Sequence, residues 1–397
     1  RAIVQLDAVL AAPIAEWAVC APAKTSAWPG LAAALVALVK DTIAPALARY
    51  RDFLAREILP RGRTGAAEGL GGLKHGDIYY RGYIAAHVGN GQTPAELHAI
   101  GLREIARTDD AIASLGGTPL GTRDLAGAIA RLRGDRALYF SSAPELVAAA
   151  ADGLARARDA LPRWFGRLPK ADCVMREIPA HEAPFTTIAY YREPHYDGSK
   201  PGEYFVNTYQ PETRPRFELA ALTFHESIPG HHLQIAIAQE LGALPAFRKL
   251  DGSTAFVEGW ALYTERLADQ MGLYTSDLDR LGAASYDAWR ASRLVVDTGI
   301  HSLGWTRAQA EDFMRLHTAL TDINISNEVD RYIGWPGQAL GYKVGQLEIL
   351  RLRAEAEAAL GAKFDLKAFH EVVLGAGAVT LPVLEQRVRA WIARTKG

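Results

Sequence analysis

The sequence predicts a mainly α-helical fold with a small antiparallel β-sheet near the middle of the chain. Ala- and Leu-rich segments with apolar residues at helical spacing recur along most of the 397 residues. Only the segments 173–191 and 202–209 are rich in β-branched and aromatic residues and bounded by prolines and glycines. The chain is 49% hydrophobic and 22% charged, which is typical of a globular protein with a large core.

Nine segments are expected to form helices, and several begin with residues that favour a helix N-terminus. Thr93 precedes Pro94, Ser142 lies two residues before Pro144, and Thr306 precedes another helical pattern. The expected helices are residues 31–58, 94–115, 143–161, 217–228, 254–270, 276–302, 306–318, 342–360 and 381–394.

The expected sheet comes directly before the His-Glu pair at 225–226. An exposed edge of this sheet would lie near that pair and could bind an extended peptide by strand addition. The alternative is a structural hairpin that only packs on the helices.

We expect residues 1–397 to form a single catalytic unit. Its first part, 1–170, is helical, and its second part, 171–397, holds the small sheet and the metal-site helices. The chain begins at Arg1 and not at Met, so we expect its N-terminus to be truncated. The glycine-rich segment 65–72 lacks the strand–turn–helix setting of a dinucleotide loop and is interpreted as a flexible connection.

Charge and composition argue against several classes of partner. The net charge is −1 and no basic stripe is present, so we expect no nucleic-acid partner. The longest strongly apolar run, 31–39, is too short to cross a bilayer, and no signal pattern opens the chain. Cys20 and Cys173 are expected to be buried thiols. The sequence indicates neither a compartment nor an oligomeric state.

The segment 225–232, His-Glu-Ser-Ile-Pro-Gly-His-His, is the strongest functional signal. On a regular helix His232 would lie about 10.5 Å beyond His225, whereas Zn–N bonds are about 2.0–2.1 Å long. Pro229 donates no hydrogen bond and clashes with the carbonyl of His225, and Gly230 permits a tight turn. We therefore expect a helix break that brings either His231 or His232 back towards His225.

Glu258 is the expected third ligand. It lies on the predicted helix 254–270 among large apolar residues, where a carboxylate needs a partner. Glu265 is the alternative, but Arg266 beside it favours a solvated face. Glu226 follows the first ligand directly and is the expected general base. One Zn²⁺ ion is the expected cofactor, because mixed imidazole and carboxylate ligation suits zinc, although other divalent ions could bind there.

Further candidates could stabilise an oxyanion or hold the substrate. Tyr332, Tyr342, Lys343 and His301 are candidate oxyanion donors, with Tyr332 expected on a loop. The alternative is that they are core residues with satisfied polar groups. Arg290 and Arg293 could hold a substrate carboxylate, although pairing with local acids is the favoured interpretation.

Four sequence stretches resemble a bacterial family known as domain of unknown function 885. They are His225–Gln234, Glu258–Tyr263, 295–301 and 332–343, and the resemblance extends from about Phe53 to the C-terminal helix. The family is in turn similar to gluzincin-like zinc peptidases, which have a His-Glu-x-x-His helix and a Glu ligand downstream. The resemblance implies a multi-helical fold with a groove, although the spacing between the histidines is longer here.

Together these observations predict a zinc-dependent hydrolase that cleaves peptide (amide) bonds with metal-activated water and Glu226 as general base. The substrate would be a peptide. One alternative is a metal-dependent hydrolase of a small non-peptide amide or an amino-acid conjugate. Another is a non-catalytic binding protein on the same fold.

Overall fold

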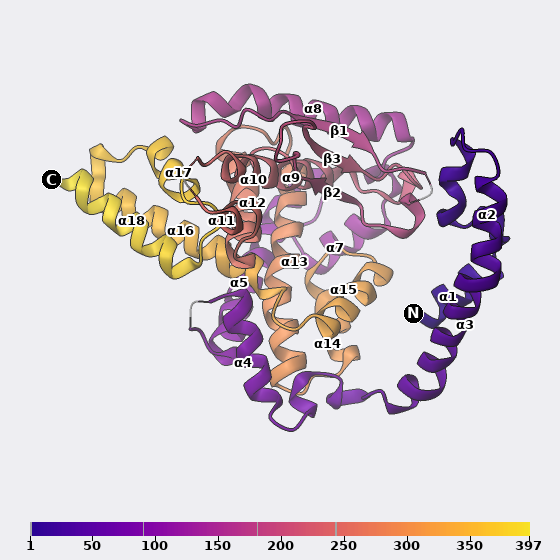
Figure 1. Cartoon of the computed structure of the whole chain (residues 1–397). Helices are drawn as coiled ribbons and strands as arrows, with labels where there is room; N and C mark the ends of the chain where they lie inside the picture. The colour runs from indigo at the N-terminus through magenta and orange to yellow at the C-terminus, as the bar shows by residue number, and fades with distance from the viewer. Residues whose placement is uncertain (1, 90, 181, 243) are drawn as a thin grey trace. The chain divides into compact units, whose positions relative to one another are not determined.

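The computed structural model describes residues 2–89, 91–180, 182–242 and 244–397 (Figure 1). The chain divides into two compact units, Arg1–Thr64 and Gly65–Gly397. The boundary falls at residue 64, so the helices between 65 and 170 belong to the same unit as the sheet and the segment 225–232.

The N-terminal unit consists of α1 (Ala2–Ala11), α2 (Leu31–Leu38) and α3 (Ala44–Phe53). The helix predicted at 31–58 is present but contains π-helical turns at 39–43 and 54–58. By length and composition the helical run Leu31–Arg61 is apolar enough to cross a membrane, and it is the one such run among the described residues. A core helix or a signal sequence passes the same test, so this is weak evidence for a span.

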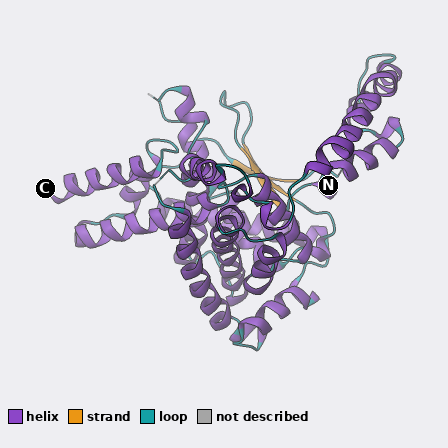
Figure 2. Ribbon diagram, turned by 90° about the horizontal axis from the view of Figure 1, so that it is seen from below, coloured by secondary structure: helices purple, strands orange, loops and turns teal. Residues whose placement is uncertain are grey.

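The prediction of a mainly helical fold is confirmed (Figure 2). The helices of the main unit at predicted positions are α5 (Pro94–Leu115), α8 (Ala143–Trp164), α9 (Arg216–Glu226), α12 (Thr254–Gln270), α13 (Asp277–Ser302), α14 (Arg307–His317), α16 (Leu340–Leu360) and α18 (Leu381–Lys396). Those not predicted are α4 (Gly76–His87), α6 (Gly117–Leu120), α7 (Leu125–Gly134), α10 (His231–Gln239), α11 (Ala246–Leu250), α15 (Asp322–Gly334) and α17 (Leu366–Leu374).

Two helix pairs form the centre of the main unit. Helix α13 packs against α5 and α9, and it is buried along most of its length. Helix α12 packs against α16 at a pair of glycines: a Cβ atom on Gly259 would lie 2.4 Å from the Cα atom of Gly345. Because neither residue has a side chain, the two backbones approach closely and bring Glu258 and Tyr342 into one region.

The sheet has three short strands, β1 (Cys173–Glu177), β2 (Ala189–Arg192) and β3 (Gly202–Val206), in the order β1-β3-β2. Strands β2 and β3 are antiparallel, as predicted, but β1 pairs with β3 in parallel, so the prediction of a wholly antiparallel sheet is wrong. Strand β2 is an edge strand and contacts α9. The sheet edge therefore lies beside the helix that carries His225.

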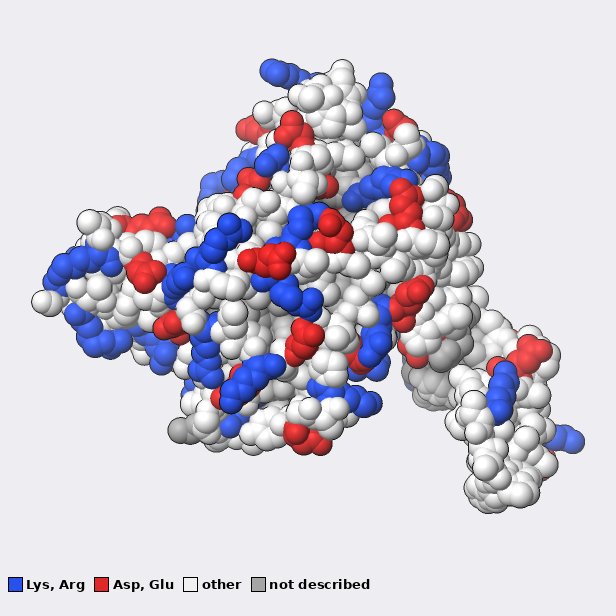
Figure 3. Space-filling view, turned by 90° about the horizontal axis from the view of Figure 1, so that it is seen from above, with Lys and Arg blue, Asp and Glu red and all other residues white. Residues whose placement is uncertain are grey.

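Charged side chains of both signs are interspersed over the face of the main unit seen in Figure 3. No large area of one sign dominates this face, as expected for a chain with a net charge of −1.

Candidate metal centre

The helix break predicted at Pro229–Gly230 is confirmed. Helix α9 ends at Glu226 and α10 begins at His231, with the cis peptide Ile228–Pro229 in the intervening turn. The turn is tight, because a Cβ atom on Gly230 would lie 2.0 Å from the carbonyl oxygen of His225. Only glycine fits this approach, and the approach brings the start of α10 against the end of α9.

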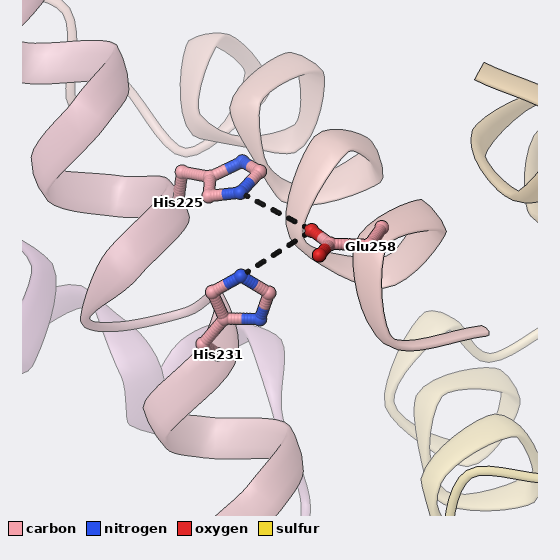
Figure 4. Close-up of side chains that lie close together, drawn as sticks. All are labelled: His225, His231 and Glu258. Carbon is pink, nitrogen blue, oxygen red and sulfur yellow. Dashed lines mark ion pairs between the residues drawn. The ribbon is translucent and has the colours of Figure 1, made fainter. Parts of the chain in front are cut away.

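Three side chains converge across this turn (Figure 4). The Nε2 atoms of His225 and His231 lie 3.8 and 3.6 Å from Oε2 of Glu258. One ligand atom from each residue lies within 4.8 Å of the other two. We call His225, His231 and Glu258 the ligand cluster.

An indole hydrogen bond joins the two sequence motifs. Nε1 of Trp260 donates to the carbonyl oxygen of Pro229 at 3.0 Å. Trp260 follows Glu258 on α12 and is fully buried. The turn that positions His231 is therefore held by the helix that supplies Glu258.

His232, the alternative to His231, lies outside the ligand cluster. Its Nδ1 shares a hydrogen bond with the hydroxyl of Tyr191 at 2.9 Å, and its Nε2 with the carbonyl oxygen of Ala171 at 3.0 Å. Both ring nitrogens thus have partners in or near the sheet, where His232 joins α10 to β2.

The prediction that Glu265 lies on a solvated helix face is wrong. Glu265 is 2% exposed, and its Oε1 lies 2.8 Å from Nδ1 of His225. It also lies 3.4 Å from Nη2 of Arg290. With Glu265 ionised, Nδ1 of His225 carries the hydrogen and Nε2 keeps its lone pair towards Glu258. Its position seven residues after Glu258, on the same helix face, was the available signal.

Burial controls the protonation of the site. It holds the pKa of His225 well below its ordinary value and also lowers that of His231, so both imidazoles are neutral at pH 7. Burial, and then the nearby carboxylate of Glu258, raise the pKa of Glu226 to about 8. The backbone N–H of Tyr191 on β2 donates to the Glu226 carboxyl group. The candidate base therefore lies between the ligand cluster and the edge strand.

The donor set fits a divalent cation. Oε2 of Glu258 is buried and has no hydrogen-bond partner among the described residues. The atoms facing it are imidazole nitrogens that hold lone pairs when the rings are neutral. Two neutral imidazoles and one carboxylate around a common point form a donor set that could hold a divalent metal ion.

Tyr342 is the candidate oxyanion donor nearest the cluster. Its ring stacks on that of His225 with a centroid distance of 6.5 Å and an interplanar angle of 12°. Its hydroxyl accepts a hydrogen bond from Nη2 of Arg331 at 3.2 Å. The guanidinium of Arg293 lies 4.2 Å from the centre of the Tyr342 ring.

The structure does not bring Tyr332 or His301 into the cluster. Tyr332 is fully buried in α15 and not on a loop as expected, and its hydroxyl donates to Glu328 at 2.7 Å. Nδ1 of His301 accepts from the backbone N–H of Leu70, and its Nε2 bonds the carbonyl oxygen of Tyr332. The end of the glycine-rich segment, residues 69–72, therefore packs on α13.

The two arginines of α13 pair with acids, as favoured. Arg290 lies beside Glu265, and Nη2 of Arg293 donates to Glu328 at 2.9 Å. Each guanidinium is only partly engaged, because Nε of Arg290 and Nη1 of Arg293 have no hydrogen-bond partner among the described residues.

A cavity of about 300 Å³ opens beside the ligand cluster. Glu258 forms part of its wall, together with Thr254 from the same helix and with Trp335 and Gln338 from the segment between α15 and α16. A small molecule or one end of a peptide fits a space of this size.

The sequence profile of the family described as "Bacterial protein of unknown function (DUF885)" matches residues 1–388. The chain belongs to this family. No curated protein matches it significantly.

Two solved structures are similar to this chain. A "putative lipoprotein" from Colwellia psychrerythraea is 31% identical, with a TM-score of 0.92 over 99% of this chain and 69% of that one. A "putative lipoprotein of unknown function" from Shewanella oneidensis is 21% identical, with a TM-score of 0.68 over 97% of this chain and 71% of that one. The second similarity shows the fold alone.

Proposed function

We propose that this protein is a metal-dependent hydrolase of peptide bonds, with zinc as its ion. The observation that carries the proposal is the convergence of His225, His231 and Glu258 around an unpartnered carboxylate oxygen, with Glu226 directly beside them. The mainly helical fold with a short sheet next to the ligand helices is consistent with a zinc-peptidase-like architecture.

When bound, the ion would supply Lewis-acid activation of water and of the scissile carbonyl. Glu226 would take a proton from the attacking water and pass it to the leaving amine. Burial and Glu258 raise the pKa of the Glu226 carboxyl group to about 8, and the charge of a bound cation would lower it again, so that the ionised form can take the proton. Glu265 would keep the hydrogen of His225 on Nδ1.

Tyr342 would donate a hydrogen bond to the developing oxyanion. Burial, and then the charge of Glu258, raise the pKa of its phenol, so the hydroxyl stays protonated. Its oxygen already accepts from Arg331, and no acceptor for its own hydrogen is found among the described residues. The hydroxyl hydrogen is therefore available to a substrate.

Strand β2 favours a peptide over a small amide as substrate. The backbone N–H of Asn207, which directly follows β3, donates to the carbonyl oxygen of Ile188. Backbone groups alternate in direction along a strand, so those of Ile188 and Tyr190 face β3. Those of Ala189 and Tyr191 face outward from the sheet, on the edge where Tyr191 reaches Glu226. An extended peptide could pair with this edge and lie across the candidate base.

Metal analysis and peptide cleavage test the proposal. The protein should bind about one equivalent of Zn²⁺ and should cleave members of a defined peptide library. A chelator should abolish cleavage, and added Zn²⁺ should restore it. Binding of no divalent ion, or cleavage that is unaffected by chelation, would contradict the proposal.

A further inference from the structure

The cavity of about 300 Å³ beside the ligand cluster has a chemical character of its own. We propose that it binds a positively charged amino group of the substrate, close to the bond that is cleaved. This inference rests on the proposed function, because it names the class of peptide that the site would take: one with an ammonium group near the scissile bond.

Carboxylates predominate among the charged groups of the cavity wall. Glu193, Asp251 and Glu258 line it, and Lys249 is the cation among its described lining residues. The ammonium of Lys249 is held by the hydroxyl of Tyr196 and the carbonyl oxygen of Gly242, each at 3.2 Å. If Glu258 binds the metal ion, the carboxylates of Glu193 and Asp251 still outnumber the ammonium group of Lys249, which already has hydrogen-bond partners. The charge of the cavity wall therefore favours a cationic ligand.

A buried amide adds a polar group that lacks a partner. Gln234 lines the cavity from α10, one turn after His231, and is 3% exposed. Its Oε1 has no hydrogen-bond partner among the described residues. A buried amide without a partner costs free energy that a ligand can recover, and the amide oxygen accepts from an ammonium group.

An aromatic surface completes the cavity. Trp335 lies on its wall and is 51% exposed, an unusual position for a residue of this size. The ring of His87 meets the indole edge-on at a centroid distance of 6.2 Å and supports its orientation. An indole face attracts cations, so Trp335 and the carboxylates favour the same ligand chemistry.

The cavity also lies at the end of the proposed path of the peptide along β2. Glu193 directly follows the last residue of β2, the edge strand that reaches Glu226 through Tyr191. A peptide paired with β2 would extend towards Glu193 and the cavity. The ammonium group can be a free peptide N-terminus or a lysine side chain, and both would reach this end of the path.

Binding to a catalytically inactive variant tests the inference without requiring turnover. The Glu226→Gln protein loaded with Zn²⁺ is titrated with three probes, and the intrinsic tryptophan fluorescence and the heat of binding are recorded. The probes are trialanine, N-acetyl-trialanine, and an N-acetylated Ala-Ala-Lys peptide. Trialanine should bind at least tenfold more tightly than its acetylated form.

Variants of the cavity wall should reduce this discrimination. Glu193→Gln and Asp251→Asn should each reduce it by about two- to fivefold, the range for partly exposed ion pairs, and Gln234→Met should also reduce it. Glu212→Gln, which removes an exposed carboxylate outside the cavity, is the matched control and should leave it unchanged.

The three probes distinguish the sources of the ammonium group. Selective binding of trialanine assigns the cavity to the N-terminus, and selective binding of the acetylated lysine peptide assigns it to a side chain. Equal binding of these two, with weaker binding of N-acetyl-trialanine, shows that the cavity accepts either ammonium group. Equal binding of all three probes overturns the inference. Amine discrimination by a protein whose parent form cleaves no peptide would overturn the proposed function and leave the ammonium site standing.

Discussion

Two clusters of ionisable side chains in the main unit differ in how their polar atoms are paired. The first is the ligand cluster of His225, His231 and Glu258. The second, which we call the paired cluster, joins α5, α12, α13 and α16 and consists of Glu104, Arg107, Arg266, Asp287 and Lys343. In the paired cluster each acid meets a cation, whereas in the ligand cluster all three residues direct lone pairs to one point.

Burial has opposite outcomes in the two places. By itself it would raise the pKa of Asp287, but Lys343, Arg266 and Arg107 outweigh it and hold that pKa well below its ordinary value. At the ligand cluster burial prevails: it lowers the pKa of both histidines and raises that of Glu226. A closed set of ion pairs is a structural feature, and an open set of lone pairs is a binding site.

Two adjacent residues of helix α12 contact different clusters. Glu265 faces His225, and the next residue, Arg266, donates to Asp287 at 2.8 Å. Substitutions at neighbouring positions should therefore produce different defects, and the following variants test this, from the largest expected effect to the smallest.

Glu226→Gln should abolish catalysis without disturbing either cluster. The amide cannot accept the proton of the attacking water, so kcat should fall by about 10²- to 10⁴-fold, the usual contribution of general acid–base catalysis. Zn²⁺ content and Tm should stay near those of the parent. Steady-state cleavage of a library substrate measures kcat. Full activity in the variant would show that Glu226 is not the general base.

Asp287→Ala should damage the fold most. It leaves Lys343 and the two arginines with Glu104 as their one remaining acid in the cluster, and removing one partner from a buried pair costs about 3–5 kcal/mol of unfolding free energy. Because the folded-state pKa of Asp287 is depressed, its contribution is present above about pH 4 and is lost as pH falls through the folded value. Urea denaturation of the metal-free protein measures it. His231→Ala is the control and should cost far less; the reverse order would refute the contrast.

Glu265→Gln should weaken Zn²⁺ binding and leave the fold intact. The amide no longer holds His225 by a charged hydrogen bond, and such supporting contacts contribute about 10- to 100-fold to metal affinity. Calorimetric titration with Zn²⁺ measures the change, with Glu258→Gln as the larger reference loss. An unchanged affinity would show that Glu265 belongs with the structural acids.

Trp260→Phe should have the smallest effect. It removes the hydrogen bond to Pro229 while keeping most of the buried ring, so we expect a loss of about 1 kcal/mol in the free energy of unfolding. Thermal unfolding with and without Zn²⁺ measures it. If the bond positions His231, metal affinity should fall as well; a stability loss with unchanged affinity would assign Trp260 to packing alone.

Local patterns predicted the elements well. Residues 94–115 and 254–270 were expected as helices, and α5 and α12 have those bounds. The break at Pro229–Gly230 followed from the missing donor of proline and the small size of glycine. Glu258 was identified because a carboxylate among apolar neighbours requires a partner.

Long-range partners were beyond the sequence. Strand character in 173–177 says nothing of pairing direction, which depends on where β2 and β3 lie. Glu265 was assigned to solvent because Arg266 follows it, but successive helical residues point in different directions. Tyr332 was placed on a loop because Pro336 and Gly337 follow, yet α15 continues to Gly334 before them.

The turn between α9 and α10 has one further consequence. His225 and His231 lie on either side of a short backbone turn. Gly230 in this turn packs closely against the carbonyl group of His225 at the end of α9. An ion held by both histidines would act as a clasp on that turn. Amide hydrogen exchange at Ser227, Ile228 and Gly230 would then report occupancy directly, because opening the turn requires release of the ion.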